Sequence, residues 1–208
     1  MNRHVDGLEN VTVMTTALVV RLEQEFSIDM EELRRVGWAS ASAELPRDEF
    51  DQDSFYLVVR QSRRPCAMVR ITVGPKSPLL AWSGGCAPLP SNPTVAELTR
   101  AVVAPPVRRL GLYRLAMLET MLRLETLDVS VATAAIELEF PGRSFLRQLG
   151  FFDVGTPLLI DDRPRQGTLV QCIRLNLGPE KYAQWLALRE YQLAHLLEHG
   201  YRVDSDLA

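Results

Sequence analysis

The sequence predicts a mixed α/β fold. Runs of β-branched residues alternate with segments of helical periodicity, in the order strand, helix, strand, helix, strand. The chain has 208 residues, of which 47% are hydrophobic, and this suits one globular domain with a sizeable core. The sequence contains neither an internal repeat nor a glycine- and serine-rich linker. We therefore expect a single domain over residues 1–208.

The first half of the chain predicts a strand, a helical region and a hairpin. Residues 11–36 begin with VTVMTT, which indicates a short strand, and continue into one or two helices that end at MEELRRVGW. The β-rich runs FYLVVR and CAMVRITV are separated by the turn-like QSRRP, the pattern of a hairpin. The segment 74–93 is rich in proline and glycine and predicts a long irregular loop.

The second half predicts a strand that is broken by prolines, followed by a helix. TVAELTRAVV reads as a strand that ends at APP, because proline has no N–H to donate and restricts the residue before it. The next segment buries one face of a helix, formed by Leu112, Leu115, Ala116, Leu118, Met121 and Leu122. VSVATAAI then predicts a strand, GRSFLRQL a short helix, GFFDVGTPLLI a loop and strand, and TLVQCIRLNL the last strand.

An extra helix is predicted at the C-terminus, over about residues 179–199. Pro179 near its first turn and Gly200 after its end are the expected start and stop signals. We expect this helix to cover the sheet or an oligomer interface. Its expected core residues are Tyr182, Leu186, Tyr191 and Leu193.

Composition excludes several classes of protein. A formal net charge of −3 and a pI of about 5.7 argue against a nucleic-acid binder. No run approaches the roughly 18 apolar residues of a membrane span, and the N-terminus lacks the features of a signal peptide, so a cytoplasmic protein without membrane contact is expected. Oligomeric state is left open. The cysteines and histidines are scattered, and although His195 and His199 stand four apart on a predicted helix, they lack a nearby third ligand, so we expect free thiols and no metal site.

The segment VRRLGLYR has the features of an anion site. A helix N-terminus carries unsatisfied N–H groups and the positive end of the helix dipole. Arg108 and Arg109 would add charge there, and Gly111 would allow the backbone to approach a phosphate closely. If the preceding strand splays open after Val103, then Val102 and Val103 would offer backbone groups to an amide-bearing chain beyond the phosphate, such as pantetheine.

These residues resemble the Gcn5-related N-acyltransferase (GNAT) superfamily. The pattern Arg108-x-x-Gly111-x-Tyr113 is similar to its R/Q-x-x-G-x-G/A motif, with Tyr113 in place of a small residue. The run FLRQLGFFDVG, residues 145–155, is similar to the closing helix and strand of that superfamily. The resemblance implies a GNAT-like fold, with a mainly antiparallel sheet, splayed central strands and helices on both faces.

A narrower resemblance covers roughly residues 33–176. RRVGW, PRDEFDQDSFYLVV, AMVRITVGP, PSNPTVAELTRAVV and GTPLLIDDRPRQGTLVQCIRL are similar to segments of the acyl-homoserine lactone synthases, the autoinducer synthases of quorum sensing. The positions that match the family's motifs are Trp38, Asp48, Asp51, Arg70, Glu97 and Arg100.

The resemblance implies acyl transfer from acyl carrier protein to the amine of S-adenosylmethionine, which then forms a lactone. The arginine and phenylalanine of that family's first helix fall near Ile28 and Glu32, where this chain has neither. The related long-chain N-acyl amino acid synthases share the acidic pair and the E-x-x-R strand, so an amino acid acceptor is the alternative.

Catalytic roles are assigned to Glu97 and Arg100. Glu97 is the candidate general base, because an attacking ammonium must lose a proton; the alternative is a structural ion pair with Arg100. An odd spacing in a strand places the two on opposite faces, which favours separate roles. Asp48 and Asp51 either hold the ammonium of the acceptor, or clamp Arg70 and Arg100 in a buried charge network, or belong to a solvated acidic loop.

The remaining assignments concern pockets and partners. Trp38 and Trp82 are candidates for lining the acyl or acceptor pocket, with Trp82 on a mobile lid. A strand N–H near Val102 would hold the oxyanion. Four arginines of the second half either meet an acidic carrier protein or form a solvated surface, namely Arg143, Arg147, Arg163 and Arg165.

Together these observations predict an N-acyltransferase. Its donor would be an acyl thioester of acyl carrier protein or coenzyme A, its acceptor a small-molecule primary amine, and no tightly bound cofactor is expected. The alternatives are an acetyl-coenzyme A N-acetyltransferase and a non-catalytic relative that binds a thioester or a partner.

Overall fold

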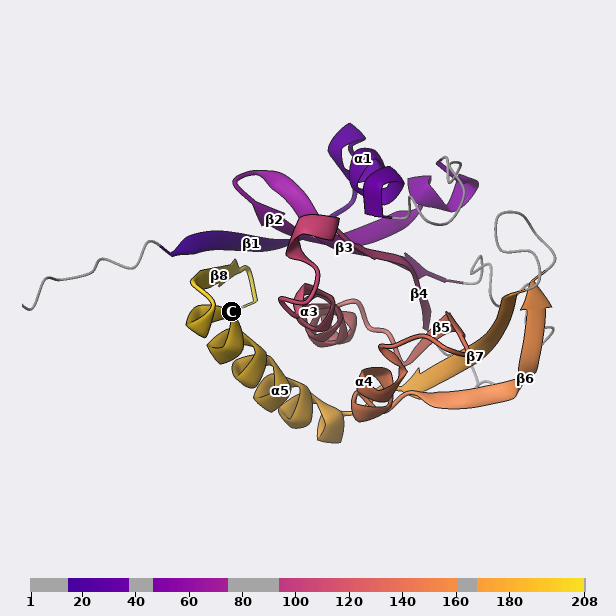
Figure 1. Ribbon diagram of the computed structural model, residues 1–208. Helices are drawn as coiled ribbons and strands as arrows, with labels where there is room; N and C mark the ends of the chain where they lie inside the picture. Colours follow the sequence, from indigo (N-terminus) through magenta and orange to yellow (C-terminus); the bar gives the residue numbers. More distant parts are fainter. Residues whose placement is uncertain (1–14, 38–46, 75–93, 161–167, 208) are drawn as a thin grey trace, which may run out of the picture.

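One eight-stranded sheet runs through the computed structural model, which describes residues 15–37, 47–74, 94–160 and 168–207 (Figure 1). The strand order is β6-β7-β5-β4-β3-β2-β1-β8. The strands are β1 (Thr16–Glu23), β2 (Ser54–Gln61), β3 (Arg64–Val73), β4 (Val95–Val103), β5 (Val131–Glu137), β6 (Phe152–Ile160), β7 (Thr168–Asn176) and β8 (Tyr201–Ser205). The helices are α1 (Ile28–Gly37), α3 (Leu112–Thr126), α4 (Arg143–Gln148) and α5 (Pro179–Glu198), with 3-10 turns η1 (Glu49–Gln52) and η2 (Pro105–Val107).

Some of the sequence assignments lie outside the described residues. These are Trp38, Trp82, Arg163, Arg165, Cys86, most of VTVMTT and nearly all of the 74–93 loop. The first described strand begins at Thr16, so it lies further along the chain than VTVMTT indicated.

The sheet is mainly antiparallel and its centre is splayed, as expected. Only the β4–β5 and β1–β8 pairs are parallel among the described strands. Residues 95–97 of β4 pair with residues 131–133 of β5, whereas β4 continues to Val103 and β5 to Glu137. The two central strands therefore part after Glu97.

The predicted hairpin and the predicted strand end are confirmed. β2 and β3 are joined through Ser62 and Arg63, whose φ angles of 49° and 72° are the positive values that a two-residue type I′ turn requires. β4 ends at Val103, and the two prolines begin η2, where a missing N–H matters least.

Helices cover both faces of the sheet, as expected (Figure 1). On β3, Ala67, Val69 and Ile71 belong to the larger core together with α3, while Met68 belongs to a smaller core together with Met30 and Leu33 of α1. This alternation follows from the two-residue period of a strand. We call the side of the sheet that packs on the first helix the α1 face.

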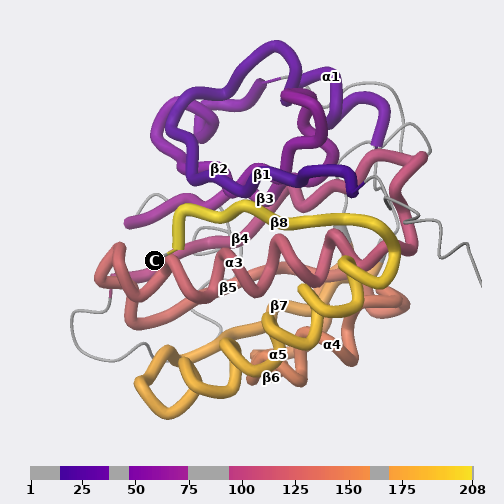
Figure 2. Tube along the Cα trace, turned by 90° about the vertical axis from the view of Figure 1, so that its left-hand side faces the viewer, coloured from indigo at the N-terminus to yellow at the C-terminus, as the bar shows by residue number. Residues whose placement is uncertain are grey.

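Helix α3 is buried on more than the one face that the sequence predicted. The predicted apolar residues are buried, but so are all residues from Leu115 to Leu124, including Glu119 and Arg123. Figure 2 shows the reason, since both α5 and β8 run beside α3. The fully buried carboxylate of Glu119 accepts hydrogen bonds from three groups, Arg123 of α3, Arg189 of α5 and Ser205 of β8.

Two expectations about the C-terminal region are wrong. β7 is not the last strand, because β8 pairs in parallel with β1 at the far edge of the sheet. In α5, Leu186 and Tyr191 are exposed rather than in the core. The buried stripe is instead Trp185, Gln192 and Leu196, because this side of the helix faces the rest of the protein. The indole N–H of Trp185 donates to the carbonyl of Leu149 over 3.0 Å.

Three further properties bear on function. No helix in the described part of the chain is long and apolar enough to cross a membrane. Within the same residues, no group of three or more His, Cys, Asp or Glu side chains could hold a metal ion. Cys66 and Cys172 are buried, and burial raises the pKa of the Cys66 thiol to about 11.

Candidate active site

The acidic segment after Arg47 forms a capped turn that aims two carboxylates inward. Asp48 is the N-cap of η1, and its Oδ1 accepts a hydrogen bond from the N–H of Phe50 over 3.1 Å. Asp51 completes a capping box by accepting from the N–H of Asp48 over 3.0 Å. The capping box therefore fixes the local orientation of both side chains.

Asp51 lies at the centre of a buried cluster of charges. Arg34 of α1 binds it with two hydrogen bonds of 2.9 Å each, and Arg70 of β3 binds it over 3.0 Å. The hydroxyl of Tyr56 donates to the same carboxylate over 2.5 Å. Burial alone would raise the pKa of Asp51, but the hydrogen bonds from Arg34 and Tyr56 outweigh it and hold that pKa well below its usual range.

Asp48 extends this cluster to β4. It accepts from Arg70 over 2.5 Å and from Arg100 over 2.9 Å, and the Nε of Arg70 donates to Thr99 over 3.0 Å. We call Arg34, Asp48, Asp51, Arg70 and Arg100 the arginine–aspartate cluster. The structure thus places the acidic pair in the clamp that was one of the three alternatives, and Asp51 with 4% of its surface exposed does not belong to a solvated loop.

The inference that Glu97 and Arg100 point to opposite faces is wrong, because β4 contains a bulge. Glu97 pairs with Thr72 and Thr99 with Arg70, but the next pair joins Val102 to Met68. Arg100, at the bulge, has a φ of 54° in the left-handed region. The bulge shifts the alternation, so that the buried Glu97 shares the α1 face with the Arg100 guanidinium bound to Asp48.

The two arginine side chains of the loop that enters α3 have different surroundings. Arg108 donates to the carbonyl of Gly37 at the end of α1 over 2.5 Å, with a longer contact of 3.4 Å to the carbonyl of Val103. Arg109 is exposed and has a φ of 74°. Gly111 is the N-cap of α3 with a φ of 80°, which favours glycine. The tyrosine that departs from the superfamily motif, Tyr113, packs edge-on against Phe140 and Phe145.

Replacing Gly37 with alanine is expected to destabilise the protein by about 1–3 kcal/mol, because α1 packs too closely on β4 to accept an added methyl group. A Cβ at position 37 would lie 2.0 Å from the Cγ2 of Val102. Urea unfolding measures the change. The control is Val36→Ala, which alters an exposed residue of the same helix and should have little effect. Equal stability of the two variants would contradict the close contact.

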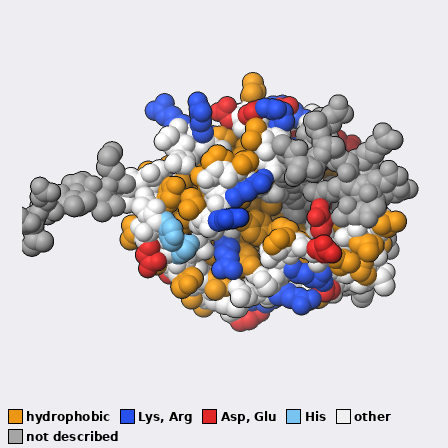
Figure 3. All heavy atoms as spheres, in the orientation of Figure 1, with side chains coloured by type: hydrophobic (Ala, Val, Ile, Leu, Met, Phe, Trp, Pro, Cys, Tyr) orange, Lys and Arg blue, Asp and Glu red, His pale blue; other side chains and the backbone are white. Residues whose placement is uncertain are grey.

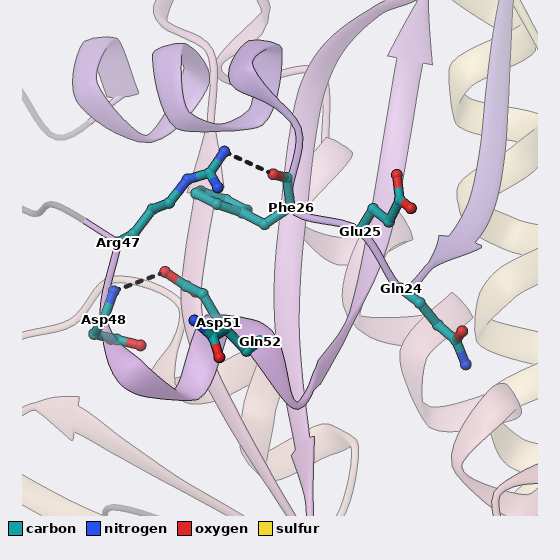
Figure 4. A pocket seen from close by; sticks show the side chains of 7 residues that line it. All are labelled: Gln24, Glu25, Phe26, Arg47, Asp48, Asp51 and Gln52. Atoms are coloured by element: carbon teal, nitrogen blue, oxygen red, sulfur yellow. Dashed lines mark hydrogen bonds between the residues drawn. The ribbon is translucent and has the colours of Figure 1, made fainter.

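A cavity of about 440 Å³ opens beside the cluster (Figure 4). It is lined by Gln24, Glu25, Phe26, Arg47, Asp48, Asp51 and Gln52. The guanidinium of Arg47 lies 5.4 Å from the centre of the Phe26 ring, and that of Arg34 lies 4.1 Å from it. Arg47 also donates to the carbonyl of Phe26 over 3.0 Å. The cavity thus combines an aromatic ring, a cation and the two aspartates of the cluster.

The sequence analysis missed Phe26, Arg34, Arg47 and Tyr56. One signal was available for Arg34, because it lies in the otherwise apolar stripe Met30, Leu33, Arg34 and Gly37, at helical spacing. The positions counted from the family's first helix do not reach the cluster, since Ile28 is 79% exposed and Glu32 pairs with Arg35 at the surface. Helix α1 supplies the arginine of the cluster from Arg34 instead.

Stability should fall in acid as Asp51 is protonated. The pKa of Asp51 is lower in the folded protein than in the unfolded chain, where it is about 3.9. Its contribution is therefore fully present above about pH 4 and is lost as pH falls from there towards the folded pKa. The measurement is the urea midpoint between about pH 6 and pH 2. In Asp51→Asn this part of the acid dependence should be missing, and an unchanged slope would contradict the assignment.

Comparison with known proteins relies on structure. No protein-family model matches the sequence, and no curated protein matches it either. Among solved structures, BjaI with MTA, a CoA-dependent acyl-homoserine lactone synthase, is 15% identical with a TM-score of 0.64, over 92% of this chain and 93% of that chain. The structure of BjaI with SAM and isopentyl-CoA has a TM-score of 0.63 and 14% identity, and the match again covers 92% of this chain and 93% of that chain.

Two further structures are similar. MesI, also a CoA-dependent acyl-homoserine lactone synthase, is 17% identical with a TM-score of 0.57, over 83% of this chain and 95% of that chain. A putative GNAT-family acetyltransferase from Desulfovibrio desulfuricans is 15% identical with a TM-score of 0.53, and the match covers 77% of this chain and 99% of that chain. The chain has a GNAT-like fold.

The GNAT-like fold extends beyond the segments that carried the sequence resemblance. That resemblance covered roughly residues 33–176, whereas the match to BjaI covers 92% of the chain. In this fold the parting of β4 from β5 and the loop into α3 lie on one continuous stretch, residues 95–113. The arginine–aspartate cluster meets the same stretch at Thr99 and Arg100.

Proposed function

We propose that the protein is an N-acyltransferase that moves an acyl group from a coenzyme A thioester to the primary amine of an amino-acid-like acceptor. The observation that carries the proposal is the parting of β4 from β5 directly after the buried Glu97. A carboxylate thereby lies where the central sheet opens, and the same strand leads into a helix N-terminus that is suited to phosphate.

The donor would lie along the second half of β4. Beyond Glu97, one edge of this strand is no longer paired with β5, so its backbone groups on that edge can bind the amides of pantetheine. The side chain of Val102 is packed under α1, so residues 102 and 103 would act through their backbone. The nucleotide phosphates would meet the turn at Arg109 and Gly111, with Arg108 joining α1 to this end of β4.

Coenzyme A is favoured over acyl carrier protein as the donor. BjaI and MesI are both described as CoA-dependent. Arg143 and Arg147, which were candidates for meeting an acidic carrier protein, both pair with Asp153, over 2.7 and 3.1 Å. Figure 3 shows basic side chains in several separate places on one face, with acidic ones among them, rather than one strongly basic patch.

The acceptor would bind on the α1 face, next to the arginine–aspartate cluster. Glu97 would take a proton from the ammonium, and the freed amine would attack the thioester carbonyl. A strand N–H near Val102 would hold the oxyanion of the tetrahedral intermediate. The C–S bond then breaks, and coenzyme A leaves as a thiolate that takes up a proton. S-adenosylmethionine is the first acceptor to test, because BjaI binds SAM together with isopentyl-CoA.

The test is turnover by the purified protein. Acetyl-, isopentyl- and octanoyl-CoA are each combined with S-adenosylmethionine or with a panel of amino acids. Release of the coenzyme A thiol is followed by absorbance and the N-acyl product by mass spectrometry, with acyl carrier protein thioesters in parallel. We expect thiol release that depends on the amine. An absence of release from every donor would refute the proposal and leave a non-catalytic relative.

The second candidate is an acetyl-coenzyme A N-acetyltransferase. It is favoured by the similarity to the Desulfovibrio desulfuricans structure and by the Arg108-x-x-Gly111 loop. Acetyl-CoA used in preference to the longer thioesters, with no reaction of S-adenosylmethionine, would select it.

A further inference from the structure

The side chain of Gln192 on α5 is buried beside the N-terminus of α3. Only 4% of its surface is exposed. Within the described part of the chain, its Nε2 is a buried donor with no hydrogen-bond partner. A buried N–H group without a hydrogen bond lowers the stability of the fold, so its presence in a native structure needs an explanation.

This side chain lies against the turn that starts α3. A Cβ built on Gly111 would lie 2.4 Å from the Nε2 of Gln192 and 3.2 Å from its Oε1. The carboxamide therefore fills the space that a side chain at position 111 would occupy. Two features favour glycine at position 111. Its φ is 80°, and α5 runs beside α3 and leaves no room for a side chain there (Figure 2).

The arrangement adds positive potential at the N-terminus of α3. The N–H end of the carboxamide is its positive end, and it is directed at a turn that already carries the positive end of the helix dipole. Arg108 and Arg109, which precede this turn in the sequence, carry charges of the same sign. Within the described residues, no acceptor offsets the Nε2 of Gln192.

We propose that Gln192 is a positioning residue for the phosphate groups of the donor. It holds the Gly111 turn in place and turns the positive end of its carboxamide towards the bound nucleotide. The inference rests on the proposed function, and it assigns a role in donor binding to the C-terminal helix, outside the segments that resemble other synthases. It predicts that substitutions of Gln192 weaken the binding of donors that carry phosphate groups more than the binding of donors that lack them.

The test compares two donors that differ in phosphate. One is an acyl-CoA and the other is the same acyl group on pantetheine, which carries no phosphate. Gln192→Glu introduces a negative charge in place of the neutral carboxamide, and Gln192→Met removes the donor at similar size. The matched control is Gln184→Glu, which adds the same charge to an exposed position of the same helix. Circular dichroism checks the folding of each variant.

Gln192→Glu should raise the KM for acyl-CoA about tenfold, as expected for a charge a few ångströms from a phosphate at the protein surface. The KM for the pantetheine thioester and the kcat for both donors should change less than about twofold. Gln192→Met should raise the KM for acyl-CoA about threefold, and Gln184→Glu should leave it unchanged. If the glutamate variant does not fold, the methionine variant decides the question alone.

Equal changes for the two donors, or no change for either, would overturn the assignment of Gln192. A wild-type protein that turns over neither thioester refutes the proposed function but not this inference. The same comparison is then made by calorimetry, with coenzyme A and pantetheine as ligands. A wild-type protein that binds no coenzyme A overturns both.

Discussion

Replacing Asp51 with asparagine is expected to lower the free energy of unfolding by about 3–5 kcal/mol, because it removes the anion between two buried guanidinium groups. Guanidinium groups stay charged in proteins, and the side chains of Arg34 and Arg70 are each no more than 3% exposed. An asparagine carbonyl can accept one of their hydrogen bonds but cannot offset their charge. Urea unfolding at pH 7, followed by circular dichroism, measures the loss.

The matched control is Asp204→Asn at the edge of the sheet. Asp204 pairs with Arg21 over 3.8 Å and its side chain is 64% exposed, so its loss should change stability by less than about 0.5 kcal/mol. A loss below about 1 kcal/mol in Asp51→Asn would show that water or other groups compensate, and the arginine–aspartate cluster would then not be essential to the fold.

Replacing Glu97 with glutamine is expected to lower kcat by about 10²–10⁴-fold, the range for removing a general base. The substitution keeps the size and leaves the pairing of Glu97 with Thr72 in the sheet intact, so folding should be retained. The rate should recover at high pH, because an acceptor that is already deprotonated no longer needs the base. The measurement is a pH profile of acyl transfer for both proteins.

Glu125→Gln, at an exposed position on α3, is the control for loss of a carboxylate and should keep wild-type activity. If Glu97→Gln stays within about fivefold of the wild type, Glu97 is not the base. A large loss that does not recover at high pH assigns it to the structural alternative instead, as a partner in the buried charge network.

Much of the element order could be predicted from the sequence because its signals act over a few residues. The prolines after Val103 end β4, and the two residues after Gln61 turn the chain into a hairpin. The edge strand β8 could not be predicted in this way. Its five residues become a strand by pairing with β1, which lies far away in the sequence.

The residues of the candidate site also divide into those that the sequence indicated and those that it did not. The sequence indicated Asp48, Asp51, Arg70, Glu97 and Arg100 through a family resemblance, and the structure brings both aspartates and both arginines into contact. It did not indicate Arg34 or Tyr56, whose bonds to Asp51 join separate segments. The roles of Trp38 and Trp82 remain predictions, because both lie outside the described residues.

By itself, then, the sequence determined the α/β order, the hairpin, the end of β4 and the glycine turn before α3. The order and the hairpin depend on local hydrophobic patterns, and the end of β4 and the glycine turn depend on the local conformational limits of proline and glycine. Only the tertiary structure decided that the bulge brings Glu97 and Arg100 to one face, and that Gln192 rests on Gly111. Cross-strand register and helix packing depend on which distant segments meet, and no local pattern records that.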